Sequence, residues 1–385
     1  MTMDFRDEDR PWLSLLTDED RWFMQQATSG DEIDPGLRTA AELQLMSPVE
    51  RMLYAQDRAD WHAALPLLQT TPVREALRRL QASGNAAASR REHRIHNSFV
   101  VPGGSSQHQE SVMVLDGPAG VGKSTTMRAY IAREMERYAQ LRYYNMLRGR
   151  GQPLDNPDFV FRPCMYVSLR ASATRVDIER QLCAQYGWPH PTNAGYMLNR
   201  LLAIAGTQII GLDEIQFIGF AGAMGRQVHN LIRDLGNQGV RVILGGNELD
   251  WVLQEQLGMV ADQSRGRWRR IDITRLPYRT KPDKEEWRHV LESVEDHLRL
   301  VNQDEPGWLS EELAEYAWGA SIGGFRSLTT LIRVAAASAI DDGSERVTRR
   351  TLDEVEVEMT AQDGREERMA TMAKLRDRSR MPVEE

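Results

Sequence analysis

The chain has 385 residues, with 48 lysines and arginines against 56 aspartates and glutamates, and a formal net charge of −8. This length allows a large core in more than one domain, and the acidic balance excludes a globally basic nucleic-acid-binding protein, so any nucleic-acid contact must come from a local patch. The two cysteines form no C-x-x-C pair and no apolar run is long enough to cross a membrane, so we expect a cytoplasmic protein without a zinc site, a disulfide framework or a membrane partner.

The first part of the chain is predicted to be helical. Ser47 followed by Pro48 is typical of a helix cap and a first helical position, and Thr71-Pro72 repeats the signal. Residues 82–109 are rich in small and polar side chains, which predicts a linker and a flexible turn. The sequence therefore predicts a separate helical extension over residues 1–90.

The stretch from Val112 to Thr126 has the pattern of a buried strand, a glycine loop and a helix start. Its loop matches G-x-x-x-x-G-K-[ST] in full, a pattern whose glycines let successive backbone N–H groups converge on phosphate oxygens. We expect Lys123 to reach the β- and γ-phosphates of ATP and the Ser124 hydroxyl to bind Mg²⁺. The predicted nucleotide-binding residues are Gly117, Pro118, Ala119, Gly120, Val121, Gly122, Lys123, Ser124 and Thr125.

A second motif, at residues 208–214, is a hydrophobic strand that ends in two carboxylates. Asp213 is predicted to hold Mg²⁺ through water, and Glu214 is predicted to polarise a water for attack on the γ-phosphate. Kinases of small molecules usually lack the second acid. The two motifs together therefore predict a Mg²⁺-dependent ATPase that converts ATP and water to ADP and phosphate.

Strands and helices alternate through the middle of the chain. Strands are predicted over 160–169 and 240–244, and helices over 176–186, 195–204 and 225–235. This alternation predicts a parallel sheet with helices on both faces, with the phosphate-binding motifs at the carboxyl ends of the strands. Asn247 follows the last strand, where it is predicted to orient the attacking water, and the alternative is an ordinary strand-end turn.

From Lys281 onward the pattern is all-helical. Helices are predicted over 281–298, over 311–318 with Ser310 as its cap, and over 325–340 after a glycine-rich break, with a last helix capped by Thr348 or Thr351. We therefore divide the chain into a helical extension (1–90), an α/β base (91–278), a helical lid (279–360) and a charged tail (361–385).

The combined pattern resembles AAA+ ATPases and, more narrowly, the TniB/TnsC type of transposition regulator, whose relatives include IstB and MuB. The resemblance rests on GPAGVGKST, on LDEIQFIGFAGAMGRQVHNLIRDLGNQGVRVILGGNELDW, and on DQSRGRWRRIDITRLPY, VLESVEDHLRL and GGFRSLTTLIRVAAASA, and it covers roughly residues 95–355. It implies an α/β fold, namely a P-loop AAA+ base whose parallel sheet is flanked by helices, followed by a small helical lid.

The resemblance also implies roles for several arginines. Arg267 or Arg265 would be the arginine finger that reaches the ATP of a neighbouring subunit, and Arg267-Trp268 resembles the Arg-Phe pair of the family. The alternative is that this arginine-rich run binds DNA or faces solvent. Arg326 would contact the γ-phosphate in cis and couple the nucleotide state to the lid, with an arginine on the helix surface as its alternative.

The resemblance also implies a homo-oligomer that assembles as a ring or helical filament on duplex DNA. Such an assembly would contact the DNA phosphates and would not read the bases. The candidate DNA contacts are Arg170, Arg175 and Arg226, with exposed loop arginines as the alternative.

The implied function is that of an ATP-dependent regulator of DNA transposition, and thus of DNA recombination. It would assemble on target DNA with ATP, recruit and activate a transposase with a target-selection protein, and disassemble on hydrolysis. The alternatives are a nucleotide-switched signalling or phage-defence ATPase, and a replication-initiator or helicase-loader relative.

Overall fold

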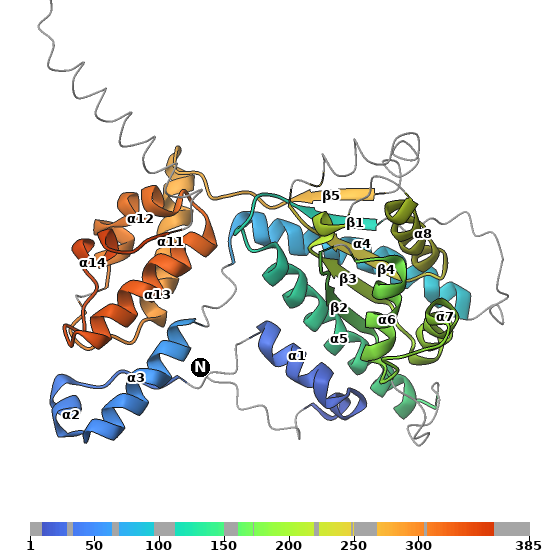
Figure 1. Ribbon diagram of the computed structural model, residues 1–385, viewed down its shortest axis with the longest axis horizontal. Coiled ribbons are helices and arrows are strands. Elements are labelled where there is room, and N and C mark those ends of the chain that lie inside the picture. The colour runs from blue at the N-terminus through green and yellow to red at the C-terminus, as the bar shows by residue number, and fades with distance from the viewer. Residues whose placement is uncertain are drawn as a thin grey trace, which may run out of the picture.

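The computed structural model describes residues 10–28, 34–63, 69–95, 112–149, 161–171, 173–218, 223–247, 249, 268–303 and 306–357. An α/β base that carries a β-sheet lies beside a smaller all-helical region, as Figure 1 shows. The chain crosses between them after strand β5, and helix α3, from the N-terminal part of the chain, lies beside the all-helical region.

The sheet consists of β1 (Val112–Asp116), β2 (Cys164–Ser168), β3 (Ile209–Asp213), β4 (Arg241–Gly245) and β5 (Trp268–Asp272). Its strands are all parallel and follow the order β2-β3-β4-β1-β5, as the sequence predicted for the fold class. Because β4 lies between β1 and β3, the carboxyl ends of these three strands meet at one edge of the sheet. The sequence did not predict β5, since this edge strand exposes most of its polar side chains and lacks an apolar run.

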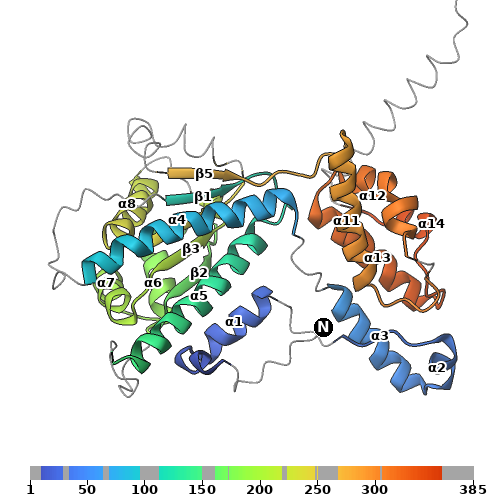
Figure 2. The same cartoon turned by 180° about the vertical axis from the view of Figure 1, so that it is seen from behind.

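Helices cover both faces of the sheet. One face packs against α6 (Arg175–Gln185), α7 (Ala194–Ala205) and α8 (Ala223–Asn237). The other face packs against α5 (Lys123–Leu147), η2 (Pro11–Leu15), α1 (Asp18–Thr28) and α4 (Thr71–Ile95), and Figure 2 shows α4 running across this side. Successive strand residues point to opposite faces, so Val114 belongs to the first core and Met113 and Leu115 to the second.

The all-helical region contains α11 (Lys281–His297), η4 (Trp308–Glu312), α12 (Ala314–Ser321), α13 (Phe325–Asp341) and α14 (Arg349–Asp353). Its core surrounds the fully buried Trp287, whose indole N–H donates to the carbonyl of Ala314 at 2.9 Å. Thr348 caps α14, which decides between the two caps that the sequence allowed. The predicted Ser310 cap is wrong, because the Glu295 carboxylate binds the hydroxyl of Ser310 at 3.0 Å and Ser310 lies inside the π-helical turn η4.

The N-terminal helices are not separate from the rest of the molecule. Leu13, Met24 and Leu80 belong to the same core cluster as β1 and α5, whereas α3 (Pro48–Ala63) packs on α13. The predicted linker is also helical in its first part, because α4 continues to Ile95 through a run of alanines, the strongest helix formers. Among the described residues, the N-terminal segment has no core cluster of its own and instead contacts both the base and the all-helical region.

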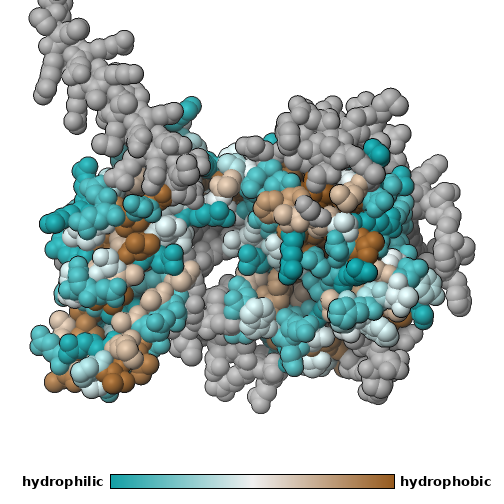
Figure 3. Space-filling view, in the orientation of Figure 1, coloured by the Kyte–Doolittle hydropathy of each residue, from teal (hydrophilic) through white to brown (hydrophobic). Residues whose placement is uncertain are grey.

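Figure 3 shows apolar side chains at the end of the all-helical region where α2 (Ala40–Leu45) and α3 lie. The large apolar residues that remain exposed there are Leu37, Leu45, Val49, Met52 and Leu53. Within the described ranges, no helix is both long enough and apolar enough to cross a membrane.

Candidate active site

The glycine loop joins the buried end of β1 to the start of α5. The Asp116 carboxylate anchors it, because Oδ1 accepts the N–H groups of Gly117 at 2.7 Å and Leu249 at 3.1 Å. Gly117 has φ +148°, and a Cβ there would lie 2.1 Å from the carbonyl oxygen of Ile273. Gly122, with φ +90°, is the N-cap of α5. The loop therefore needs glycine at both positions, and it directs the N-terminus of a 25-residue helix at the space in front of it.

Lys123, the first residue of α5, is 7% exposed. Its ammonium group donates to the carbonyl oxygens of Gly117 at 2.9 Å and Pro118 at 2.6 Å, and to Oδ1 of Asn247 at 2.7 Å. Burial lowers the pKa of Lys123 from its ordinary value, although the nearby carboxylates of Asp116, Asp213 and Glu214 oppose the shift. Uncharged oxygens thus hold this buried cation, and anionic ligands would bind it more strongly.

Asp213, at the end of β3, is 2% exposed. The hydroxyl of Tyr166 on β2 donates to Oδ2 at 2.7 Å, and the Glu214 N–H donates to Oδ1 at 3.0 Å. A Cβ on Gly245 would lie 2.5 Å from Oδ1, so the neighbouring strand β4 leaves room for this carboxylate through a missing side chain. Burial and the Asp213 charge raise the pKa of Tyr166, which stays a hydrogen-bond donor.

Glu214 and Asn247 lie at the ends of neighbouring strands, as the sequence predicted for their elements. They are joined by Gln216, whose side-chain amide donates to Oε2 of Glu214 and accepts the N–H of Asn247 at 3.2 Å. Gln216 therefore bridges the carboxylate of Glu214 to the backbone of Asn247, and the side-chain oxygen of Asn247 in turn accepts from Lys123.

Helix α13 closes the site from the all-helical region. The N–H of Arg326 donates to the carbonyl of Gly120 at 3.0 Å, and the ring of Phe325 is next to Gly122. A Cβ on Gly323 would lie 2.1 Å from the carbonyl oxygen of Leu276, so the chain turns into α13 at a position that requires glycine. Arg326 and Arg333 are seven residues apart, which places both on the face of α13 that lines the site.

These elements enclose a cleft of about 750 Å³. This volume falls within the usual range for small-molecule sites. The residues that line it are Ala119, Gly120, Gly122, Lys123, Ser124, Thr125, Arg128, Tyr166, Ser168, Asp213, Glu214, Gln216, Phe217, Gly246, Asn247, Phe325, Arg326, Thr329, Thr330 and Arg333.

The predicted arginines differ in their placement. Arg326 lines the cleft, whereas Arg265 and Arg267 lie outside the described residues. Arg170 follows β2, Arg226 lies in the first turn of α8, and both are exposed. Arg175 forms ion pairs within the chain, with Glu179 at 2.7 Å and Asp234 at 3.3 Å.

Several residues that line the cleft were not predicted from the sequence. Arg333 had a signal, because it follows Arg326 by two helical turns, and Gln216 had one in its position beside the Asp-Glu pair. Tyr166 had none, since an aromatic residue within a strand is also typical of a core position. Arg128 lies 5.5 Å from the centre of the Tyr166 ring, a contact between α5 and β2 that only the fold creates.

Comparison with known proteins agrees with this architecture. Residues 106–252 match the family described as AAA domain, and no curated protein matches the sequence. The solved structure of the Aeropyrum pernix Orc1 protein in complex with DNA has a TM-score of 0.50 and 20% identity, over 76% of this chain and 67% of that one. Cdc6p from Pyrobaculum aerophilum has a TM-score of 0.43 and 13% identity, over 66% of this chain and 62% of that one. Residues 106–252 of this chain therefore match an AAA-family ATPase domain with the P-loop AAA+ fold. Helical regions precede and follow this domain in the chain.

Proposed function

We propose that this protein hydrolyses ATP in the cleft between the glycine loop and α13. The observation that carries the proposal is the convergence of Lys123, Asp213, Glu214 and Asn247 from three strand ends on one space, which Arg326 faces from the all-helical region. A buried cation, two carboxylates and a flanking arginine in one cleft are the groups that phosphoryl transfer to water requires.

The residues of the cleft fit a nucleoside triphosphate. The glycine loop supplies backbone N–H groups, and Lys123 can exchange its carbonyl partners for phosphate oxygens. We assign residues 117–125 to the phosphates, and Ser124 and Asp213 to Mg²⁺, which supplies charge neutralisation of the phosphate oxygens when it is bound. Glu214 then accepts the proton of the attacking water, Asn247 orients that water, and Arg326 binds the γ-phosphate in cis.

Arg267 or Arg265 is proposed to act on the ATP of a neighbouring subunit. The support for this role is the resemblance of Arg267-Trp268 to the Arg-Phe pair of the family. An arginine supplied in trans also fits a transition state whose charge lies on the equatorial phosphate oxygens.

Duplex DNA is the proposed partner, contacted through phosphates by Arg170 and Arg226. The resemblance to TniB/TnsC-type regulators supports a role in transposition, in which an ATP-bound homo-oligomer on target DNA recruits a transposase and a target-selection protein and disassembles after hydrolysis. We propose that the base over residues 91–278 and the lid over residues 279–360 are the domains that move relative to each other during the ATP cycle.

A replication-initiator-like ATPase is the second candidate. The Orc1 protein that shares this fold was solved in complex with DNA, and this favours DNA-binding functions over a signalling ATPase that does not bind DNA.

The test is ATP turnover measured against protein concentration, with and without duplex DNA of unrelated sequence. Specific activity should rise steeply with concentration, because each cleft needs the arginine of a neighbour, and the DNA effect should fade as salt rises. Mixing Arg267→Ala and Lys123→Ala subunits should restore part of the activity, since each supplies what the other lacks. Flat specific activity without complementation would contradict the assembly, and absence of turnover under all conditions would contradict the ATPase.

A further inference from the structure

We infer that Gln216 is a positioning residue that fixes the carboxylate of Glu214 and links it, through Asn247, to the phosphate-binding Lys123. This inference rests on the proposed ATPase function, in which Gln216 has no assigned role so far. Three observations carry it: the backbone conformation of Glu214, the partners of the Gln216 amide and the space that Gly246 leaves.

The backbone of Glu214 is left-handed, with φ +59°. This conformation is unfavourable for a residue with a side chain and persists where surrounding contacts hold it. Here the short helix η3 (Ile215–Phe217) follows at once, closed by a bond from the Phe217 N–H to the Glu214 carbonyl at 3.1 Å. The sharp turn at Glu214 brings the side chain of Gln216 back beside the Glu214 carboxylate.

The two ends of the Gln216 amide have different partners. Its Nε2 donates to Oε2 of Glu214, and its Oε1 accepts the N–H of Asn247 at 3.2 Å. A flipped amide would place like partners against each other, so these two contacts fix its orientation. Asn247 in turn accepts from Lys123 at 2.7 Å, which connects the glycine loop on β1 to the carboxylate after β3 across the end of β4.

Gly246 leaves the space that this arrangement needs. A Cβ at that position would lie 2.6 Å from Oε1 of Gln216, 2.7 Å from a methyl carbon of Leu249 and 2.9 Å from one of Ile215. Real Cβ atoms essentially never approach so closely. The Gly245-Gly246 pair at the end of β4 therefore makes room for Asp213 on one side and for Gln216 on the other.

The connection has a consequence for the reaction. Phosphate oxygens compete with Asn247 for the Lys123 ammonium group, so occupation of the glycine loop changes the hydrogen bonds of Asn247. Gln216 joins the backbone N–H of Asn247 to the Glu214 carboxylate, so it holds the proposed base and the strand end that carries the Asn247 side chain in one arrangement. With Oε2 held by Gln216, the other oxygen of Glu214 has a defined direction from which to accept a water proton.

The experiment compares Gln216→Ala with wild type and with Gln208→Ala, a matched control. Gln208 precedes the same strand and donates to the carbonyl of Gly206 at 2.8 Å, away from the cleft. ATP affinity and single-turnover hydrolysis are measured for each, in the wild-type background and together with Glu214→Gln. We expect Gln216→Ala to slow hydrolysis by ~10-fold or more at nearly unchanged ATP affinity, and to cause no further loss when Glu214 is already replaced.

Gln216→Glu supplies a second readout, because it keeps the shape but replaces the donor by a carboxylate. Two neighbouring carboxylates repel each other, so Gln216→Glu should displace the Glu214 carboxylate and slow single-turnover hydrolysis at least as much as Gln216→Ala does, at nearly unchanged ATP affinity. This variant also serves if the alanine variant does not fold.

Three results would overturn the inference. They are wild-type turnover in Gln216→Ala, an equal loss with and without Glu214, and wild-type turnover in Gln216→Glu. An inactive wild-type protein would instead contradict the proposed ATPase itself and the inference with it, so the two failures are distinguishable.

Discussion

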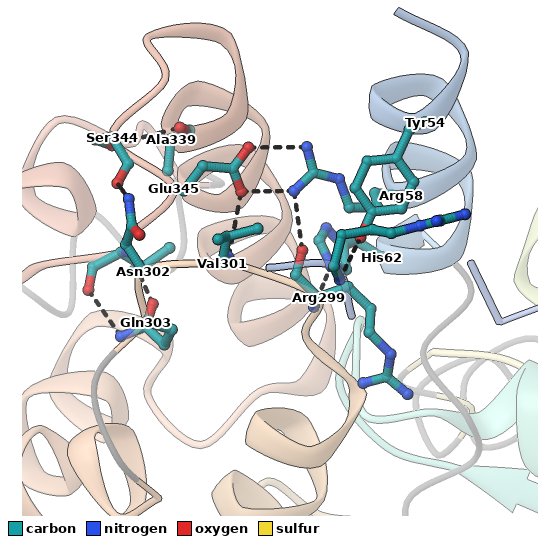
Figure 4. Close-up of polar contacts among 12 residues, drawn as sticks. Tyr54, Arg58, His62, Arg299, Val301, Asn302, Gln303, Ala339, Ser344 and Glu345 are labelled. Atoms are coloured by element: carbon teal, nitrogen blue, oxygen red, sulfur yellow. Dashed lines mark hydrogen bonds and ion pairs between the residues drawn. The ribbon is translucent and has the colours of Figure 1, made fainter. Parts of the chain in front are cut away.

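The cleft and the junction between α3 and the all-helical region both bury charged side chains, but they partner them differently. In the cleft, the Lys123 ammonium group is held by two carbonyl oxygens and one amide oxygen. In the junction, drawn in Figure 4, the guanidinium of Arg58 binds both oxygens of Glu345, at 2.5 and 2.9 Å. The Lys123 ammonium group can therefore exchange its uncharged partners for an anion, whereas the Arg58 guanidinium already binds a carboxylate.

Aromatic and backbone contacts reinforce the junction. Trp61 stacks on His297 with 4.4 Å between ring centres and donates to the His297 carbonyl at 2.6 Å. His62 accepts the N–H of Arg299 at 2.9 Å through Nε2, which requires a neutral ring nitrogen. The buried lysine of the cleft can exchange its partners, whereas the buried ion pair of the junction attaches α3 to the all-helical region. We therefore expect α3 to move with the all-helical region as one unit.

The largest effect that would separate the two regions is expected from Glu214→Gln. The substitution keeps the shape of the side chain but removes the proposed base, so ATP hydrolysis should fall by ~10²–10⁴-fold. ATP affinity and the free energy of unfolding should change little, because the carboxylate is not part of a core cluster. Turnover and thermal unfolding measured on the same sample check both statements, and near-normal turnover would mean that another residue orients the water.

Arg58→Ala tests the opposite behaviour in the junction. It leaves Glu345 buried without its partner, and breaking such a pair costs about 3–5 kcal/mol. Chemical denaturation should show this loss, while turnover of the folded fraction stays within a few-fold of wild type. Arg78→Ala is the control, because its ion pair with Glu75 lies on the surface, where solvent screens it, and its loss should leave the free energy of unfolding nearly unchanged. Equal losses in the two variants would refute the comparison.

A smaller effect is expected from acid. Burial lowers the pKa of His62 to about 4, and the positive charges of His297, Arg58 and Arg299 act in the same direction. Because the pKa of His62 is near 6.5 in the unfolded chain, the stabilising contribution is complete above that pH and is lost as the pH falls toward 4. Between about pH 7 and pH 5 the loss should be ~2 kcal/mol.

Hydrogen exchange of α3 is the appropriate measurement, since protonated His62 can no longer accept the Arg299 N–H. His62→Gln keeps an acceptor that does not titrate and should remove most of the acid sensitivity. An unchanged pH dependence in that variant would assign the effect to other groups.

The parallel sheet, and the parts of the cleft that are local in the chain, can be predicted from the sequence. The glycine loop, the Asp213-Glu214 pair and the start of α13 each rest on a pattern a few residues long, because a strand followed by a helix N-terminus needs those residue types at that spacing. Each of these elements appears in the structure within a few residues of its predicted range.

The contacts between segments distant in the chain depend on the tertiary structure. The sequence gives no sign that Arg58 meets Glu345 or that Gly246 makes room for Gln216, since such contacts depend on how elements pack and not on local periodicity. The same reason explains the error about the N-terminal segment. Its helices were predicted from local signals, but local signals do not tell whether an apolar helix face packs against its own neighbours or against a distant core.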